Sequence, residues 1–182
     1  MNKTSTLIPG LFVIEPNLFK DLRGAFVKTF HSKEMADLGL DFHFEEEFYS
    51  VSTKGVLRGM HFQIPPFDHE KMVTCLVGSV LDVLVDLRPG ATYGKFFSVE
   101  LNAKTPRTVF TPRGIAHGFL SLSDESLMLY KTSCIHSTEH DRGIRWDSFG
   151  FHWPNLQMYI SDRDRNHPSF RDFSTPFGSI EL

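Results

Sequence analysis

Short apolar runs separated by turn residues fill the middle of the chain. The run from Val80 to Leu87 is almost continuously apolar, with Asp82 and Asp86 as its interruptions. Runs of this length, bounded by glycine, proline and polar clusters, are typical of strands rather than helices. The pattern predicts strands over residues 47–52, 56–62, 72–77, 80–87, 95–101, 107–111, 116–120 and 127–133. Many short strands in succession indicate an all-β sandwich or closed barrel.

The two ends of the chain are less regular. Residues 11–15 and 26–31 are predicted strands, with a turn at 21–24 between them. Residues 32–38 are the best helix candidate, with Ser32 as its N-cap, Glu34 in its first turn and Gly39 as its stop. From residue 141 onward, Trp, Pro and charged residues are mixed. This pattern predicts an irregular, packed C-terminal segment with a short helix.

Composition limits the function classes. The 182 residues suit one domain, 1–182, and the formal charge of −3 gives no electrostatic basis for binding nucleic acid. No apolar run has the length of a membrane span, and the first residues lack the apolar core of a signal peptide. The two cysteines, Cys75 and Cys134, lie in apolar surroundings and are expected to be buried free thiols. A cytoplasmic location is therefore expected.

The segment from Gly55 to Gly78 carries the most informative spacing. Five residues separate Gly55 from His61, and Gln63 and Lys71 follow before Gly78. This resembles the first metal-binding motif of the cupin superfamily, in which the positions of Gln63 and Lys71 hold His and Glu. The second cupin motif is present as Pro112, Gly114 and His117. A neutral amide and an ammonium are poor metal ligands, so no metal is expected. Lys71 instead supplies a positive charge that could stabilise an oxyanion.

The wider chain resembles the dTDP-4-dehydrorhamnose 3,5-epimerase family. The segments that carry the resemblance are FKDLRGAF (19–26), SVSTKGVLRGMHFQ (50–63), KMVTCLVGSVLDVLVDLR (71–88), PRGIAHGFL (112–120), MLYKTS (128–133), DRGIRWD (141–147) and ISDRD (160–164). The resemblance implies a cupin jelly roll, or double-stranded β-helix, with short N- and C-terminal helices. It also implies a homodimer in which an N-terminal segment reaches the partner's site, and a nucleotide-linked 4-keto-6-deoxyhexose as substrate, with no cofactor.

The resemblance assigns the catalytic roles. His61 matches the base that removes a proton beside the ketone, and Asp164 matches the carboxylate that orients it, with Asp162 as the obvious rival. Lys71 is expected to stabilise the enolate, and Tyr130 matches the proton donor on the opposite face. A base and an acid on opposed faces are what inversion of a carbon beside a ketone requires.

Other residues are expected to bind the substrate. Arg58 and His117 match contacts to the diphosphate and the sugar site, and Arg163 matches a further basic contact. Arg23 matches a nucleotide contact from the neighbouring subunit. Gln63 and Asp141 are also expected to line the site.

Departures from the family pattern cluster around the nucleobase. Lys28, Glu46, Phe48 and His136 stand where the family has Glu, Gln, Asn and Tyr. Exchanging an acceptor for the donor Lys28, and an amide for the acceptor Glu46, fits cytosine in place of thymine. A CDP-linked sugar and simple drift of these positions around a dTDP-linked sugar are both open.

Three other functions compete with epimerisation of carbon 3, carbon 5 or both. They are a related sugar-nucleotide ketoisomerase or dehydratase, a non-catalytic sugar-binding cupin, and a metal-dependent dioxygenase. A mere binder needs no opposed acid and base, and the dioxygenase would lack two of four ligand positions. Rhamnose, lipopolysaccharide O-antigen and antibiotic sugar pathways all fit an epimerase.

Overall fold

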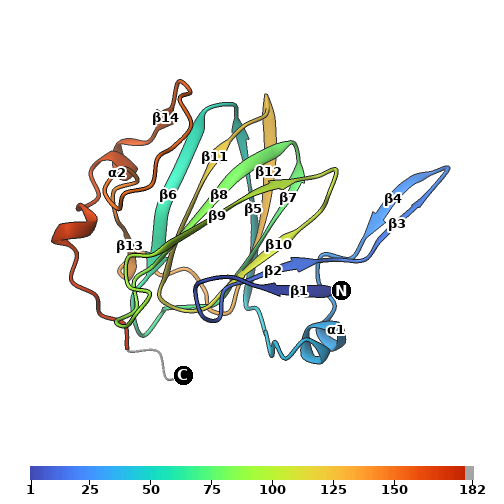
Figure 1. The fold of residues 1–182 in the computed structure, drawn as a ribbon, viewed down its shortest axis with the longest axis horizontal. Helices are drawn as coiled ribbons and strands as arrows, with labels where there is room; N and C mark the ends of the chain where they lie inside the picture. The colour runs from blue at the N-terminus through green and yellow to red at the C-terminus, as the bar shows by residue number, and fades with distance from the viewer. Residues whose placement is uncertain (179–182) are drawn as a thin grey trace.

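Two β-sheets that face each other form the body of the protein, as Figure 1 shows. The computed structural model describes residues 1–178. The first sheet has the spatial order β1 (Asn2–Ser5), β2 (Phe12–Glu15), β10 (Thr108–Thr111), β7 (Lys71–Val77), β12 (Glu125–Thr132) and β5 (Glu46–Thr53). The second has the order β13 (Asp141–Gly143), β6 (Val56–Gln63), β11 (Ile115–Ser121), β8 (Ser79–Asp86) and β9 (Phe96–Asn102), with β14 (Tyr159–Ile160) parallel to β6. This is the expected jelly roll.

The space between the sheets is filled by apolar side chains from both inner faces. The largest buried cluster is made of residues that alternate along the strands, as inward-facing positions must. Its members are Ile8, Leu11, Val73, Cys75, Val80, Leu84, Leu101, Val109, Ile115, Phe119, Met128 and Tyr130. Tyr130 is therefore part of the core wall as well as a candidate site residue.

The strand predictions between residues 47 and 133 are confirmed. All eight predicted strands are present, and each observed end lies within two residues of its predicted position. The short edge strands β1, β13 and β14 were not predicted, because their two to four residues are too few to show a period.

The predictions for the N-terminal part need two corrections. The strand expected over 26–31 ends at Val27, because Phe30 packs edge-on against Phe42 and Phe44 in a small separate core. Helix α1 (Ser32–Asp37) is capped by His31 rather than by Ser32, since the His31 Nδ1 accepts a hydrogen bond of 3.3 Å from the backbone N–H of Glu34. Gly39 has a φ of 73° just after the helix, which is the expected stop.

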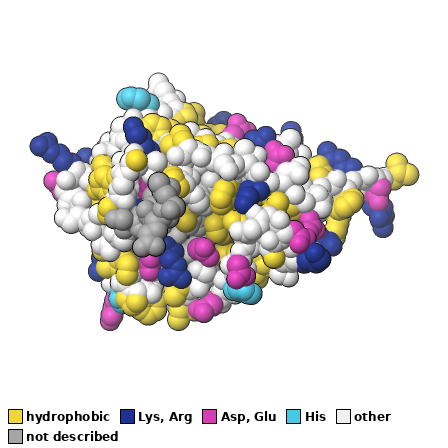
Figure 2. Space-filling view, turned by 60° about the horizontal axis from the view of Figure 1, so that its bottom comes forward, with side chains coloured by type: hydrophobic (Ala, Val, Ile, Leu, Met, Phe, Trp, Pro, Cys, Tyr) yellow, Lys and Arg dark blue, Asp and Glu magenta, His cyan; other side chains and the backbone are white. Residues whose placement is uncertain are grey.

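A two-stranded hairpin extends away from the body. It consists of β3 (Leu18–Asp21) and β4 (Gly24–Val27), and Figures 1 and 2 show it projecting beyond the rest of the molecule. Its side chains are mostly exposed, including those of Phe19 and Phe26. The expected turn at 21–24 is the tip of this hairpin. Exposed apolar side chains gathered in this way are typical of a surface that contacts another molecule.

The C-terminal segment covers the outer face of the second sheet. Its aromatic residues pack on Met60, Val83 and Ala116, and it includes helix α2 (Asp162–Arg165) and the 3₁₀ turn η1 (Phe170–Asp172). The expected irregular segment with a short helix is confirmed. Within residues 1–178, no helix has the length and apolar character needed to cross a membrane. Cys75 is buried as expected, but Cys134 is half-exposed, because β12 ends at Thr132 and leaves it in the following loop.

Candidate active site

One cavity of about 290 Å³ opens between the two sheets and collects most of the expected residues. Alternate residues line it in the first half of β5 (Glu46, Phe48 and Ser50) and at the end of β12 (Tyr130 and Thr132), which is the period of a strand face. The lining residues are Glu46, Phe48, Ser50, Arg58, His61, Phe62, Gln63, His69, Lys71, His117, Phe119, Tyr130, Thr132, Cys134, His136, Asp141 and Arg163. Arg23 and Lys28 do not line this cavity, since they belong to the hairpin tip and to the loop after the hairpin.

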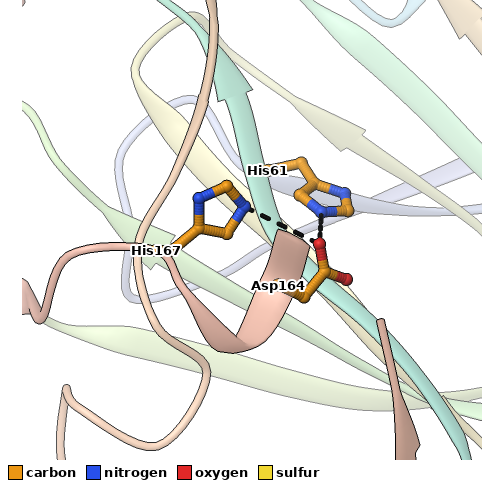
Figure 3. A group of neighbouring side chains, drawn as sticks. All are labelled: His61, Asp164 and His167. Carbon is orange, nitrogen blue, oxygen red and sulfur yellow. Dashed lines mark hydrogen bonds and ion pairs between the residues drawn. The ribbon is translucent and has the colours of Figure 1, made fainter. Parts of the chain in front are cut away.

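His61 and Asp164 form a closely bonded pair at the wall of the cavity (Figure 3). The His61 Nε2 lies 2.7 Å from the Asp164 Oδ1, and the backbone N–H of Gly59 donates to Oδ2 at 3.1 Å. Asp162, two residues earlier on the same short helix, is exposed. The bond to Asp164 uses Nε2, so Nδ1 is the nitrogen available to take a proton from a ligand in the cavity.

The local sequence explains why Asp164 reaches His61. Ser161 caps helix α2, with its hydroxyl accepting from the N–H of Asp164 at 3.1 Å. Gly59 has a φ of 140°, and a Cβ there would lie 2.5 Å from the Cα of Gly118 on the neighbouring strand. Only glycine permits this approach of β6 to β11, and it leaves the Gly59 N–H directed at the carboxylate.

Burial and hydrogen bonding set the protonation states of this pair. Burial lowers the pKa of His61, and nearby Arg163 and Lys71 lower it further, while Asp164 opposes them. Burial alone would raise the pKa of Asp164, but the nearby His167 ring and the hydrogen bonds from His61 and the Gly59 N–H hold it well below its usual range. At neutral pH the pair is therefore a neutral imidazole beside a carboxylate, which is the state of a base ready to accept a proton.

Tyr130 approaches the same cavity from the opposite sheet. It lies on β12, stacks on Phe48 with ring centroids 4.8 Å apart, and shares a 3.1 Å hydrogen bond with the Ser50 hydroxyl. Burial raises the pKa of Tyr130 well above its usual range. The phenol therefore stays protonated and can act as an acid, but not as a base, at physiological pH.

Two further groups give the cavity its charge. Burial lowers the pKa of Lys71 to about 8, with Asp141 and Asp82 opposing the change. His117 pairs with the fully buried Asp82, Nε2 to Oδ1, at 2.7 Å, and it lies opposite His61 in the β6–β11 ladder. The half-buried Lys71 ammonium thus lines the same cavity as His61 and Tyr130 and can stabilise negative charge that develops on a ligand there.

Two residues that were expected to contact the substrate, Gln63 and Glu46, form hydrogen bonds within the protein. Gln63 is fully bonded, since its Oε1 accepts from the N–H of Ser137 at 2.5 Å and its Nε2 donates to the carbonyl of Phe67 at 2.9 Å. Its contribution is thus to fix the loop after β12. Glu46 accepts from the N–H of His136 at 2.7 Å.

The rim of the cavity carries a charged cluster and an exposed arginine. Asp141 accepts from Arg163 at 2.6 Å and lies 3.2 Å from the His136 ring. Arg58 remains exposed, with its Nε bonded to Ser52 at 3.0 Å. The rim therefore places cationic groups at the mouth of the cavity, where they can bind an anionic ligand.

Sequence reasoning missed several residues at this site, and three of them have side chains that can take part in chemistry. His69 and Cys134 line the cavity, and burial lowers the pKa of His69 to about 3, so it is a neutral hydrogen-bonding group. His167 lies behind the His61–Asp164 pair (Figure 3). None of the three belongs to a recognisable motif, and His167 lies beyond the end of helix α2 at Arg165, so no helical spacing identifies it.

Comparison with known proteins gives a consistent result. Residues 5–172 match the model of the dTDP-4-dehydrorhamnose 3,5-epimerase family. The protein named dTDP-4-dehydrorhamnose 3,5-epimerase from Shigella flexneri is 42% identical over 176 residues, which is 94% of this chain and 97% of the relative.

Solved structures agree with the sequence relatives. The dTDP-6-deoxy-D-glucose-3,5-epimerase of Legionella pneumophila, in complex with dTDP-4-keto-L-rhamnose, superposes with a TM-score of 0.94 at 31% identity, covering 100% of this chain and 99% of that one. A 3′-monoepimerase from Streptomyces bikiniensis, in complex with dTDP-quinovose, superposes with a TM-score of 0.87 at 28% identity, covering 96% and 91%. The chain belongs to the dTDP-4-dehydrorhamnose 3,5-epimerase family of isomerases.

Proposed function

We propose that this protein inverts carbon 5, carbon 3 or both of a nucleotide-linked 4-keto-6-deoxyhexose. The observation that supports this most strongly is the opposition of His61 and Tyr130. The histidine, paired with Asp164, comes from one sheet, and the protonated phenol comes from the other, with both lining one cavity. Inversion beside a ketone needs a base on one face of the ring and an acid on the other.

The steps follow from these positions. His61 Nδ1 takes the proton from the carbon beside the ketone, and the electron pair moves into an enolate whose oxygen the Lys71 ammonium stabilises. Asp164 stabilises the resulting imidazolium. Tyr130 then donates its proton to the opposite face of the same carbon. Proton exchange with water restores both residues before the next inversion.

An experiment in deuterated water tests this chemistry. The protein is incubated with dTDP-4-keto-6-deoxyglucose in D₂O, and deuterium at carbons 3 and 5 is mapped by NMR. We expect incorporation with inversion at one or both carbons. Conversion to a 3-keto sugar would instead indicate the ketoisomerase, and binding without any exchange would indicate a sugar-binding protein.

For the nucleotide, we propose dTDP. The names of the relatives support thymidine, and Glu46 accepts a hydrogen bond from the backbone of His136, so one of its oxygens is already used within the protein. Calorimetric titration of dTDP and CDP into the wild type and Glu46→Gln tests this. Tighter binding of dTDP by the wild type is expected. Equal or tighter binding of CDP, reversed in Glu46→Gln, would instead support a cytosine-reading pocket at Lys28, Glu46, Phe48 and His136.

We further propose a homodimer in which the β3–β4 hairpin reaches the partner's cavity. Phe19 and Phe26 expose 58% and 59% of their surfaces on this hairpin, and Arg23 lies in its turn, paired with Asp21. The edge strand β5 exposes Tyr49 and Val51 as a complementary apolar surface. Arg23 would then contact the nucleotide in the partner's site.

Subunit complementation tests the shared site. Arg23→Ala and His61→Asn are each expected to be weakly active alone, because each damages every site. After mixing and subunit exchange, a mixed dimer holds one intact site, so activity should recover. No recovery, with subunit exchange verified by mass spectrometry, would contradict the sharing of Arg23. We propose the cytoplasm as the location, where the thiols of Cys75 and Cys134 stay reduced.

A further inference from the structure

His167 is a half-buried histidine that the proposed reaction does not use, and its Nε2 atom is inaccessible to solvent. Its Nε2 has no hydrogen-bond partner within normal distance in residues 1–178. The nearest acceptor is Asp164 Oδ1, at 3.7 Å, the same oxygen that His61 contacts at 2.7 Å. The rings of His61 and His167 are 5.8 Å apart and nearly perpendicular, on either side of the carboxylate (Figure 3).

The fold makes room for His167 at this place. Gly143 of β13 lies opposite His61 in the β13–β6 ladder, and a Cβ on Gly143 would overlap the His167 ring. On the chain side, Asn166 closes helix α2, and the carbonyl of Pro168 accepts from Arg145 at 2.8 Å. The backbone on both sides of His167 is thus fixed. The space that its ring occupies exists only because residue 143 is glycine.

We propose that His167 is a positioning residue whose Nε2–H donates to Asp164 and thereby limits the basicity of His61. An unprotonated Nε2 would direct its lone pair at the carboxylate, so the proton belongs on Nε2. The 3.7 Å separation is long for a hydrogen bond, but hydrogen bonds at catalytic sites are often long without a ligand and tighten in the substrate complex. A second donor on Oδ1 withdraws charge from the oxygen that stabilises the His61 imidazolium. His61 therefore returns its proton more readily between inversions.

The inference rests on the proposed role of His61 as the base, and it predicts the direction in which the pKa of His61 changes when His167 is replaced. Without the donor, Asp164 stabilises the imidazolium more strongly, so the pKa of His61 rises. The other charged groups around the pair are unchanged: Lys71 on β7, Arg163 on α2, Arg58 on β6, and His117 with Asp82 on β11 and β8. Because neutral His61 is the active form, the acidic limb of kcat/KM should move to higher pH.

Two substitutions separate this role from packing. His167→Phe keeps a ring without a donor, and His167→Gln keeps a donor at a similar reach. We expect His167→Phe to move the acidic limb up by roughly 0.5–1 pH unit, the size of one hydrogen bond, which is a three- to tenfold loss below that limb. His167→Gln should restore the wild-type profile. His43→Phe, at an exposed histidine that does not line the cavity, is the matched control.

The pKa of His61 can also be measured without catalytic turnover. NMR titration of ¹⁵N-labelled His61 gives its pKa directly, so the result does not depend on which sugar is the substrate. In the wild type, the ¹⁵N shift of His167 Nε2 should be that of a protonated, pyrrole-type nitrogen. A pyridine-type Nε2, an unmoved His61 pKa in His167→Phe, or equal losses at every pH in both variants would each overturn the proposal. Failure of the epimerase assay alone, with these shifts as expected, would overturn the proposed function instead.

Discussion

Replacing Asp164 by Asn changes one atom at the centre of the site and should nearly abolish catalysis. The carboxylate accepts two hydrogen bonds, from His61 at 2.7 Å and from the Gly59 N–H at 3.1 Å. An amide has one acceptor and one donor, so one of these bonds must be lost. If the amide nitrogen faces Gly59, two donors oppose each other in a buried site. If it faces His61, Nε2 must become an acceptor, which moves the proton to Nδ1 and removes the base.

The expected loss follows from what His61 supplies. A positioned general base contributes roughly 10²–10⁴ in rate, and in a serine protease triad the same Asp→Asn exchange costs about 10⁴ through the wrong tautomer. Asp164 does not line the cavity, so dTDP affinity should hardly change. We therefore expect kcat and kcat/KM to fall together by about 10²–10⁴.

Deuterium incorporation at carbons 3 and 5 measures the loss, and calorimetric binding of dTDP reports whether the cavity remains intact. Asp162→Asn is the matched control, because Asp162 is two residues away on the same helix and exposed. It should retain wild-type exchange. A loss of less than about tenfold in Asp164→Asn, or equal losses in both variants, would refute the assignment of Asp164.

Three further predictions test the other groups. Tyr130→Phe should still wash deuterium into the substrate but lose inversion by roughly 10²–10⁴, because His61 acts before the donor; equal loss of exchange would argue against Tyr130 as the acid. The kcat/KM of the wild type should fall as pH rises through about 8, where Lys71 loses its charge, and Lys71→Met should remove this alkaline limb; a limb that persists in Lys71→Met belongs to another group. Activity should survive dialysis against a chelator, since Gln63 and Lys71 hold two of the cupin ligand positions; loss restored by a divalent metal would refute this.

The strands of the jelly roll were predictable because each one repeats a local pattern that its neighbours reinforce. The edge strands were not, because β13 and β14 exist only through their bonds to β6. The N-cap of α1 is His31 rather than Ser32, because the His31 ring accepts a hydrogen bond from the N–H of Glu34 at 3.3 Å. Cap preferences rank residue types, but the tertiary setting of a single ring decides such a case.

The candidate site was predictable where the family resemblance rests on short motifs. His61, Lys71 and Tyr130 lie on three different strands, and the fold brings them to one cavity. The preference for Asp164 over Asp162 also came from the resemblance, and the cap of a one-turn helix, which no periodic pattern reveals, gives its physical reason. His167 could not be found at all from sequence, because its place depends on Gly143 of a different strand.

The two altered cupin positions contribute in different ways to this cavity. Gln63 uses both ends of its amide within the protein and fixes the loop that carries His136. Lys71 places a half-buried cation in the same cavity as His61 and Tyr130, with Asp82 and Asp141 favouring its charged form. A metal supplies positive charge to an oxyanion, and an ammonium can supply it too, with the difference that its charge depends on pH. Because burial lowers the pKa of Lys71 to about 8, we expect the proposed chemistry to have an upper pH limit that a metal-bound barrel would not share.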